Sequence, residues 1–337
     1  MGRLCVYCDG NVRSGLGHLS RCMALATIVR KFDSMVRVVF IGHYEQYALD
    51  RMQASAFDFI QLPIDVFNTA YVLEVLGFQE ADFLLMDSYT LPQSFYNELS
   101  AKALKWGVLD DFELLDYSDA QLVINFRVGA TEMFNYAART RALGPQFFPV
   151  NLEFESIRRK NQGQQVEQKV EHILICLGGK DLFGVSLELL KTVALVFNLA
   201  RITLLSSDES LVVTLNERYK GTELINIECL CTDVHKKMTN VDLIVSGGGL
   251  LKYEASYCAI PNATLSQTRE QQQDTLVLEK EGVTLSLGLA SQFDKEEVKV
   301  SLKRLSQKKR QIMREQQVLV YPVDVFQPLA RVVLDQL

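Results

Sequence analysis

The stretch that decides the fold is Leu4-Cys5-Val6-Tyr7-Cys8-Asp9, followed by Gly15-Leu16-Gly17-His18. The apolar run predicts a buried strand, and the residues after the glycines predict a helix. That helix is indicated by apolar positions that recur at helical spacing: Leu19, Met23, Leu25, Ala26 and Ile28. A strand, a glycine loop and a helix in this order are typical of a Rossmann-like domain, in which backbone amides face the carboxyl edge of the sheet.

The alternation of apolar runs with helical patterns continues along the chain after this stretch, in two series. Apolar runs at residues 36–42, 82–87, 105–111 and 120–126 alternate with helical patterns, which predicts a parallel sheet buried on both faces. A second series begins at 172–179 and continues at 200–207, 224–230, 241–249 and 262–266. We therefore predict an N-terminal Rossmann-like domain at 1–153, a polar linker at 154–170, a C-terminal Rossmann-like domain at 171–324 and a final helix at 325–337.

Composition narrows the class of partner. The chain has 337 residues and a net charge of −6, so we expect no nucleic acid partner, because a phosphate-binding face needs surplus Lys and Arg. No apolar run approaches about 20 residues, and no secretory signal precedes the first strand, which predicts a cytoplasmic protein without membrane insertion. We expect a small-molecule partner. The oligomeric state stays open, a monomer included.

Cysteine usage argues against metal. Seven cysteines are an odd number in mostly apolar stretches, which is typical of reduced core thiols rather than a disulfide framework. Cys5 and Cys8 have the spacing of a zinc knuckle, but no second pair or suitably spaced His accompanies them. We expect no metal site. The short basic run Lys308-Lys309-Arg310 is interpreted as a solvated helix face.

The first candidate site runs from Asp9 to His18. Gly15 and Gly17 allow close backbone approach, and His18 projects from the first helical turn, where an imidazole can take a proton from water. The alternative is a histidine that only caps or packs the helix start. Two glycines fall short of a dinucleotide fingerprint.

The second domain offers two glycine turns. Gly178-Gly179-Lys180-Asp181 follows an apolar run, and Asp181 either binds substrate or caps the next helix. Ser246-Gly247-Gly248-Gly249 precedes a helix that carries Glu254, an arrangement in which amides face a diphosphate and a carboxylate accepts ribose hydroxyls. The alternative for this turn is close helix-to-sheet packing.

Polar groups also follow other expected strands. Gln271-Gln272-Gln273 is interpreted as part of a polar loop after Leu265. Asp87-Ser88-Tyr89 and Asp110-Asp111 end two strands of the first domain. Each could be a turn, but their convergence on one edge predicts a binding site there.

Six motifs carry a family resemblance when taken in order: GLGHLSRCMALA (15–26), MDSY (86–89), LDDF (109–112), ALGPQFF (142–148), CLGGKD (176–181) and SGGGLLKYE (246–254). They resemble the UDP-sugar hydrolase of pseudaminic acid biosynthesis, which releases 2,4-diacetamido-2,4,6-trideoxy-L-altrose from UDP. That family is similar to GT-B enzymes, so the resemblance implies an α/β fold with two Rossmann-like parallel-sheet domains that face each other across a cleft.

The resemblance implies a role for each matching residue. His18 matches the general base of an inverting, metal-independent hydrolysis without a cofactor. Asp9, Gly15, Gly17, Tyr89 and Asp181 match substrate-side positions. The nucleotide-side positions are Gly178, Gly179, Gly248, Gly249, Leu250, Glu254 and Gln271.

The chain departs from the family in four places. Tyr7-Cys8-Asp9 replaces Arg-x-Asp, and Leu250-Leu251 replaces Ser-Thr, which removes hydroxyls that could bond a diphosphate. Asn151 replaces an arginine, and Glu270 replaces an asparagine. These changes suggest an altered substrate. The leading hypothesis is hydrolysis of a nucleotide-linked amino or deoxy sugar for a nonulosonic acid or surface glycan; the alternatives are a glycosyltransferase of the same fold and a non-catalytic nucleotide-sugar binder.

Overall fold

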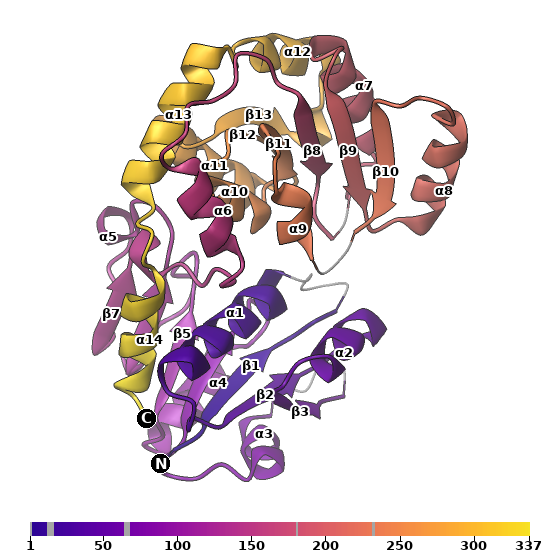
Figure 1. Cartoon of the computed structure of the whole chain (residues 1–337). Coiled ribbons are helices and arrows are strands. Elements are labelled where there is room, and N and C mark those ends of the chain that lie inside the picture. The colour runs from indigo at the N-terminus through magenta and orange to yellow at the C-terminus, as the bar shows by residue number, and fades with distance from the viewer. Residues whose placement is uncertain (1, 12–16, 64–67, 180, 231–232) are drawn as a thin grey trace. The chain divides into compact units, whose positions relative to one another are not determined.

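The computed structural model describes residues 2–11, 17–63, 68–179, 181–230 and 233–337. The chain divides into two compact units (Figure 1). Unit 1 comprises Met1–Leu152 together with Asp324–Leu337, and unit 2 comprises Glu153–Val323. Each is built around its own sheet.

Unit 1 contains a parallel sheet in the order β3-β2-β1-β4-β5-β6-β7. Its strands are β1 (Leu4–Cys8), β2 (Val38–Gly42), β3 (Asp58–Gln61), β4 (Phe83–Asp87), β5 (Trp106–Leu109), β6 (Leu122–Asn125) and β7 (Thr140–Leu143). The chain reverses direction along the sheet between β3 and β4, so β1 and β4 are neighbours in the middle. Ligands of open α/β sheets bind at such a reversal.

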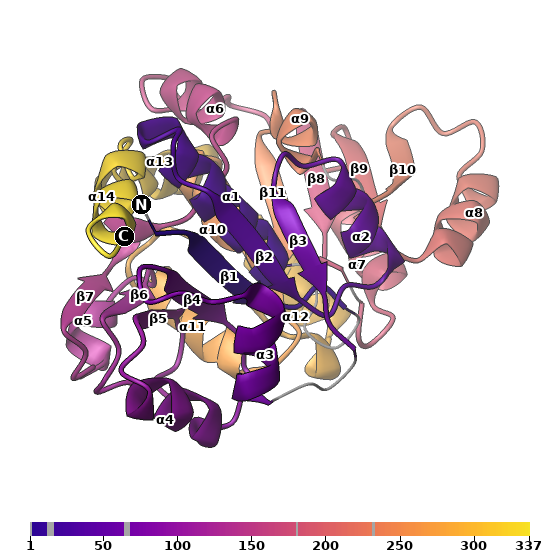
Figure 2. The ribbon, with the colours of Figure 1, turned by 90° about the horizontal axis from the view of Figure 1, so that it is seen from below.

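Helices cover both faces of this sheet (Figure 2). They are α1 (Gly17–Phe32), α2 (Gln46–Gln53), α3 (Thr69–Leu76), α4 (Gln93–Ala101), α5 (Ala130–Met133), the 3-10 turn η1 (Pro145–Phe147) and α14 (Phe326–Leu334). Alternate strand residues such as Cys5 and Tyr7 pack in a core cluster with Phe95 and Leu99 of α4. On the opposite face α1 packs against the C-terminal α14.

Unit 2 repeats the pattern with a parallel sheet in the order β10-β9-β8-β11-β12-β13. The strands are β8 (His172–Cys176), β9 (Arg201–Ser206), β10 (Ile225–Cys229), β11 (Leu243–Gly247), β12 (Asn262–Ser266) and β13 (Leu285–Leu289). The helices are α6 (Phe154–Asn161), α7 (Ser186–Val196), α8 (Glu209–Arg218), α9 (Val234–Met238), α10 (Leu251–Tyr257), α11 (Arg269–Lys280), α12 (Lys295–Lys303) and α13 (Gln307–Val320), with the 3-10 turn η2 (Ala290–Gln292).

The expected linker at 154–170 is wrong for its first half. Residues 154–161 form α6, whose buried face contains Phe154, Ile157 and Arg158. The Arg158 guanidinium donates to the carbonyls of Tyr257 (3.3 Å) and Tyr321 (2.7 Å). Three buried side chains at spacings of three and four residues are an amphipathic helix stripe, which the surrounding polar residues hid in the sequence.

The expected solvated helix face at 308–310 is confirmed for Lys308 and Lys309, which are exposed on α13, and is wrong for Arg310. Arg310 is 2% exposed rather than solvated. Its guanidinium donates to the carbonyls of Glu167 (2.9 Å) and Gln168 (3.1 Å), which ties the polar segment after α6 to α13. Hydrogen bonds to backbone carbonyls let a buried arginine replace its lost hydration. In the part of the chain that the structure describes, no helix has the length and apolar character needed to span a bilayer.

Candidate functional site

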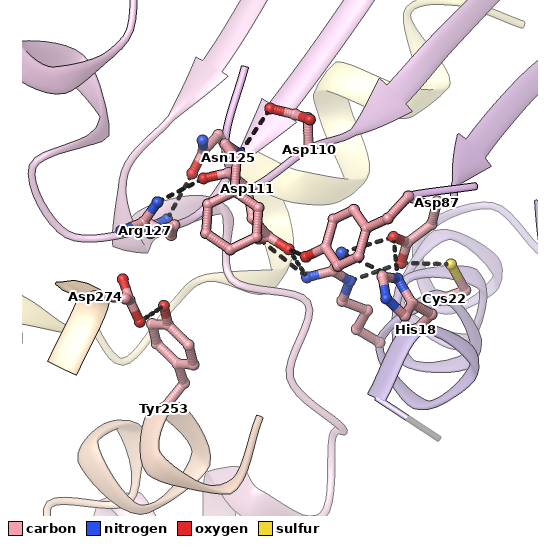
Figure 3. Close-up of polar contacts among 12 residues, drawn as sticks. His18, Cys22, Asp87, Asp110, Asp111, Asn125, Arg127, Tyr253 and Asp274 are labelled. Atoms are coloured by element: carbon pink, nitrogen blue, oxygen red, sulfur yellow. Dashed lines mark hydrogen bonds and ion pairs between the residues drawn. The ribbon is translucent and has the colours of Figure 1, made fainter. Parts of the chain in front are cut away.

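The first candidate site lies at the carboxyl edge of the unit 1 sheet. β1, β4, β5 and β6 are consecutive in the sheet, so the residues that follow them share one edge. α1 begins at Gly17 above this edge. The two acidic strand ends that the sequence singled out, at Asp87 and at Asp110-Asp111, therefore lie beside the start of the helix that carries His18, and the predicted convergence in this unit is observed (Figure 3).

His18 is held by a carboxylate. Its Nδ1 lies 2.6 Å from Oδ1 of Asp87, and the two side chains are 10% and 0% exposed. The ring of Tyr89 meets the imidazole edge-on, with 4.6 Å between the ring centroids. When Nδ1 carries the proton that Asp87 accepts, Nε2 is left as a proton acceptor. A carboxylate that fixes the tautomer in this way is how enzymes orient a histidine base.

Arg21 joins the two acidic strand ends. It lies one helical turn after His18 and donates to both oxygens of Asp87 at 2.6 Å. A second face of the guanidinium donates to both oxygens of Asp111, at 2.8 and 3.1 Å. Arg21 is 6% exposed, so these bonds form away from water and are strong.

The contacts close into a ring of five side chains, which we call the His18 ring: His18, Asp87, Arg21, Asp111 and Tyr89 (Figure 3). Tyr89 donates its hydroxyl to Asp111 and so returns to the His18 imidazole. The ring holds two carboxylates and one guanidinium. With neutral His18 the five side chains together have a net charge of −1, and this sum becomes zero when His18 accepts a proton.

Asp87 remains ionised within this ring. Burial alone would raise the pKa of its carboxyl group, but Arg21 and then His18 more than offset burial and hold that pKa well below its usual range. Cys22 adds a weak hydrogen bond from its thiol to Oδ2 at 3.4 Å. Asp87 can therefore stabilise a positive charge on His18 at any ordinary pH.

Asp110 differs from its neighbour Asp111. Burial raises the pKa of the Asp110 carboxyl group, and its oxygens accept from the backbone N–H groups of Phe112 (3.0 Å) and Glu113 (2.6 Å) and from the Tyr117 hydroxyl (3.2 Å). Tyr136 donates to it as well. These bonds fix the loop after β5, which in turn presents Asp111 to Arg21.

Asp9, Gly17 and Tyr89 are the other sequence-predicted residues of unit 1 that the structure describes. Gly15 lies outside the described residues. Gly17 begins α1, and a Cβ added there would meet no atom within 4 Å, so packing does not require the glycine. Asp9 accepts a hydrogen bond from the His43 N–H at 2.9 Å, which ties the end of β1 to the loop after β2. Tyr89 is 51% exposed although its hydroxyl is bonded.

The second candidate site is the glycine turn after β11. A Cβ on Gly247 would lie 2.3 Å from the Leu177 carbonyl oxygen, and one on Gly248 would lie 2.6 Å from Gln271 Cβ. Both glycines are thus required by packing, as the alternative interpretation held. Gly249 is exposed, and a Cβ there would meet nothing within 4 Å. Packing leaves the choice of glycine at this position unexplained.

Lys252 lies directly beneath this turn in α10. Its ammonium donates to the Gly248 carbonyl at 2.7 Å and pairs with Asp274 at 2.6 Å. Tyr253 donates its hydroxyl to the same carboxylate (Figure 3). Leu250 and Glu254 flank these residues and are half-buried. Lys252 and Asp274 were not among the site residues predicted from the sequence.

Gln271 does not lie on a loop as expected. It occupies the first turn of α11, where the Thr268 hydroxyl accepts from its N–H at 3.3 Å as an N-cap. The Gln271 side-chain carbonyl accepts from the Gln267 N–H at 2.9 Å. The threonine cap was hidden because the residues around it are all polar, so no apolar period marked the helix start.

Asp181 and the first glycine turn follow β8. Oδ2 of Asp181 accepts from the N–H (2.8 Å) and hydroxyl (2.7 Å) of Ser186 at the start of α7, which is the capping role. Oδ1 is buried with no hydrogen-bond partner among the described residues. Gly178 has φ +95°, a backbone conformation that favours glycine, and the Gly179 carbonyl accepts from Ser207 at 2.8 Å.

Arg21 is the main residue of unit 1 that sequence reasoning missed. It lies three residues after His18, so both side chains occupy one face of a helix. That spacing was a usable signal, since a charged residue on the buried side of a helix needs a partner. Within the described ranges, no cluster of three or more His, Cys, Asp or Glu side chains is arranged to hold a metal ion.

Comparison with curated proteins gives distant relatives. An uncharacterized protein of Methanocaldococcus jannaschii is 21% identical over 280 residues, which is 80% of this chain and 57% of that protein. The pseudaminic acid cytidylyltransferase and UDP-2,4-diacetamido-2,4,6-trideoxy-beta-L-altropyranose hydrolase of Helicobacter pylori is 28% identical over 180 residues, which is 52% of this chain and 29% of that protein. The chain thus spans about half or less of these relatives. No family model matches it.

Solved structures share the fold over nearly the whole chain. MurG of Acinetobacter baumannii superposes with a TM-score of 0.67 at 12% identity, covering 99% of both chains. UDP-GlcNAc 2-epimerase of Neisseria meningitidis, bound to UDP-GlcNAc, superposes with a TM-score of 0.64 at 11% identity and covers 99% of this chain and 100% of that one. The expected GT-B-like α/β fold with two parallel-sheet domains is confirmed.

Proposed function

We propose that the chain hydrolyses a nucleotide-activated amino or deoxy sugar, of the UDP-2,4-diacetamido-2,4,6-trideoxyhexose type, with His18 as the general base. The observation that carries this proposal is the 2.6 Å bond between His18 Nδ1 and Asp87. The likeness of 52% of the chain to part of the Helicobacter pylori cytidylyltransferase and hydrolase supports the substrate class. Release of a free amino sugar fits nonulosonic acid or surface-glycan synthesis.

The chemistry follows from the charge of the His18 ring. His18 Nε2 takes a proton from water while the water oxygen forms a bond to the anomeric carbon. The bond from that carbon to the phosphate oxygen breaks, its electron pair leaves with the nucleotide diphosphate, and the configuration inverts. The negative charge that the ring carries beforehand stabilises the imidazolium that this step creates, because Asp87 stays anionic.

Unit 2 supplies nucleotide binding in this proposal. Gly248, Gly249 and Leu250 form the turn assigned to the diphosphate, and Gln271 packs against Gly248. Gly178 and Gly179 form a second turn at the same sheet edge, because β8 and β11 are neighbours. Since Leu250 and Leu251 have no hydroxyl, the turn after β11 offers backbone amides to the phosphates.

Glycosyl transfer is the second candidate. The dyad formed by His18 and Asp87 can deprotonate an acceptor hydroxyl in place of water. The fold shared with MurG supports this alternative. The missing Ser-Thr pair supports the third hypothesis, a non-catalytic nucleotide-sugar binder. These functions differ in their products, so product analysis separates them.

The test is incubation of the purified chain with a panel of UDP-, CMP- and GDP-sugars that includes UDP-linked diacetamido-trideoxyhexoses, without any acceptor. Hydrolysis predicts equimolar free sugar and nucleotide, inverted at the anomeric carbon by NMR, and loss of both products in His18→Ala with nucleotide affinity retained. Turnover of the His18→Ala variant at the wild-type rate would remove His18 as the base. Strict dependence on an added acceptor would favour transfer, and binding without product would favour the non-catalytic binder.

A further inference from the structure

We propose that Lys252 is a positioning residue that aims the Gly249 amide at a phosphate of the bound nucleotide without touching that phosphate. This inference rests on the proposed function, because it assigns the turn after β11 to a nucleotide diphosphate. It concerns a lysine that the sequence analysis did not connect with any role.

The geometry of a peptide bond carries the first step. A trans peptide is planar, so its C=O and N–H point in opposite directions. The carbonyl of Gly248 is held by the Lys252 ammonium at 2.7 Å, on the buried side of the turn. The N–H that belongs to the same peptide is that of Gly249, which therefore points away from Lys252. Gly249 is exposed, so a ligand can approach this residue from the side away from Lys252.

Burial of the lysine carries the second step. The Lys252 side chain is 2% exposed, and its ammonium already bonds the Gly248 carbonyl and the Asp274 carboxylate. These partners occupy two of the three donors of the ammonium, and at 2% exposure the side chain is closed to a phosphate in solution. Lys252 is therefore poorly placed for direct phosphate binding and well placed to fix the peptide.

The pairing with Asp274 explains why a charged group can perform this task inside the unit. Asp274 is 4% exposed and lies on α11, and Tyr253 donates to it as well. The carboxylate balances the lysine charge, which would otherwise be costly to bury. A charge-assisted bond to a carbonyl is stronger than a neutral one, so the peptide of Gly248 and Gly249 is held in one orientation before the ligand arrives.

The glycine at 249 and the two leucines after it fit the same role. A Cβ at 249 would meet no atom within 4 Å, so the glycine leaves room for a ligand there. Leu250 and Leu251 provide no hydroxyl, so the turn depends on its backbone donors. Loss of the lysine should then reduce phosphate binding and leave the contacts of the nucleoside intact.

The experiment compares the affinities of a nucleoside diphosphate and of its parent nucleoside by isothermal titration. The diphosphate is whichever of UDP, CDP, GDP and dTDP binds the wild-type chain most tightly. The test variant is Lys252→Met combined with Asp274→Leu, which removes both buried charges together. Lys252→Arg is a second variant, which keeps a positive charge opposite Asp274 and so protects folding. Its planar guanidinium cannot reproduce the contact of the ammonium with the Gly248 carbonyl.

Arg314→Met is the matched control. Arg314 is another buried cation of unit 2 that donates to backbone carbonyls, those of Ala259 (2.9 Å) and Gln164 (3.3 Å). Among the described residues, no hydrogen bond joins it to the turn after β11. It reports the effect of losing a buried cation on folding alone. Circular dichroism establishes for each variant that the chain is folded before the titration.

We expect both Lys252 variants to lose at least about tenfold in affinity for the diphosphate while the nucleoside affinity changes less than about twofold. In the control Arg314→Met, the affinities for the diphosphate and for the nucleoside should not change by different factors. Equal affinity ratios in the wild-type and Lys252 variants would overturn this inference and leave the proposed function standing. If the wild-type chain binds no diphosphate of the panel, both the inference and the nucleotide assignment fail together.

Discussion

His18 and Arg21 lie one turn apart on α1 and bond the same carboxylate, that of Asp87. The imidazole takes one oxygen, whereas the guanidinium spans both. Arg21 thereby keeps Asp87 ionised, and Asp87 keeps the imidazole oriented. The proposed base depends on a helix face that presents an imidazole and a guanidinium to one carboxylate.

Asp87→Asn should reduce turnover while nucleotide binding persists. Asparagine cannot stabilise the imidazolium by charge, and its amide can donate where the carboxylate only accepts, which favours the wrong tautomer of His18. We expect kcat to fall by about 10²- to 10⁴-fold, the range for impaired acid–base catalysis. The measurement is the initial rate of free-sugar release.

A matched control exists at the other end of the same strand. Asp82 precedes β4 and pairs with Arg3 at 2.6 Å, and it is 2% exposed. Asp82→Asn breaks a buried carboxylate–arginine pair of unit 1 far from the carboxyl edge. Equal losses of kcat in the two variants would mean that the fold, and not the dyad, controls the rate.

Arg21→Met should strongly destabilise unit 1. Removing the guanidinium leaves Asp87 and Asp111 buried with reduced compensation, and breaking a buried pair costs about 3–5 kcal/mol. Arg21→Lys should lose less, because one charge remains, but it cannot bond both carboxylates bidentately. The chain has one tryptophan, Trp106, which lies 1% exposed in β5, so its fluorescence during urea unfolding reports this unit. A loss below about 1 kcal/mol for Arg21→Met would contradict a supporting role for the ion network.

Acid should remove the contribution of Asp87 to stability. Its pKa is lowered in the folded chain, so this contribution is fully present above the ordinary aspartate pKa of about 3.9 and is lost as the pH falls toward the folded value. The stability difference between the wild type and Asp87→Asn should therefore be largest near pH 6 and shrink below pH 4. A difference in Trp106 unfolding free energy that stays constant from pH 6 to pH 2.5 would show that the carboxyl charge plays no part.

The sequence predicts the strands that are buried on both faces. Apolar runs such as 82–87 and 172–179 coincide with β4 and β8 because a central parallel strand has no solvent side. Three of the four edge strands, β3, β7 and β13, escaped notice, whereas the fourth, β10, lies within the predicted run at 224–230. β3 and β7 are half-exposed, and a short edge strand with polar residues carries no distinctive period.

The sequence predicted where the candidate site residues of unit 1 lie, but not which of them contact one another. His18 and the acidic strand ends could be placed at one edge because parallel strands all end there. Their pairing could not, because a ring of five contacts depends on rotamers and on the loop that Asp110 fixes. Lys252 was invisible for a related reason: its partner Asp274 lies 22 residues away on another helix, and only the fold brings the two charges together.

Alanine at two adjacent glycines should separate packing from ligand binding in unit 2. A Cβ on Gly248 would lie 2.6 Å from Gln271, so Gly248→Ala should destabilise the unit by about 1–3 kcal/mol through overpacking. A Cβ on Gly249 meets nothing within 4 Å, and Gly249→Ala should fold with wild-type stability. Stability is read from hydrogen exchange at the amides of β11 and α10.

The affinity for the diphosphate should fall more in Gly249→Ala than in Gly248→Ala, although Gly248→Ala is the less stable variant. If a phosphate approaches the Gly249 amide, a methyl group there enters the space that the ligand needs, and diphosphate affinity should fall about tenfold or more in a fully folded protein. Gly248→Ala should lose affinity only in proportion to its disturbed turn. A Gly249→Ala variant that is stable and binds the diphosphate as tightly as the wild type would place the phosphate elsewhere. Neither packing nor ligand binding would then require a glycine at position 249.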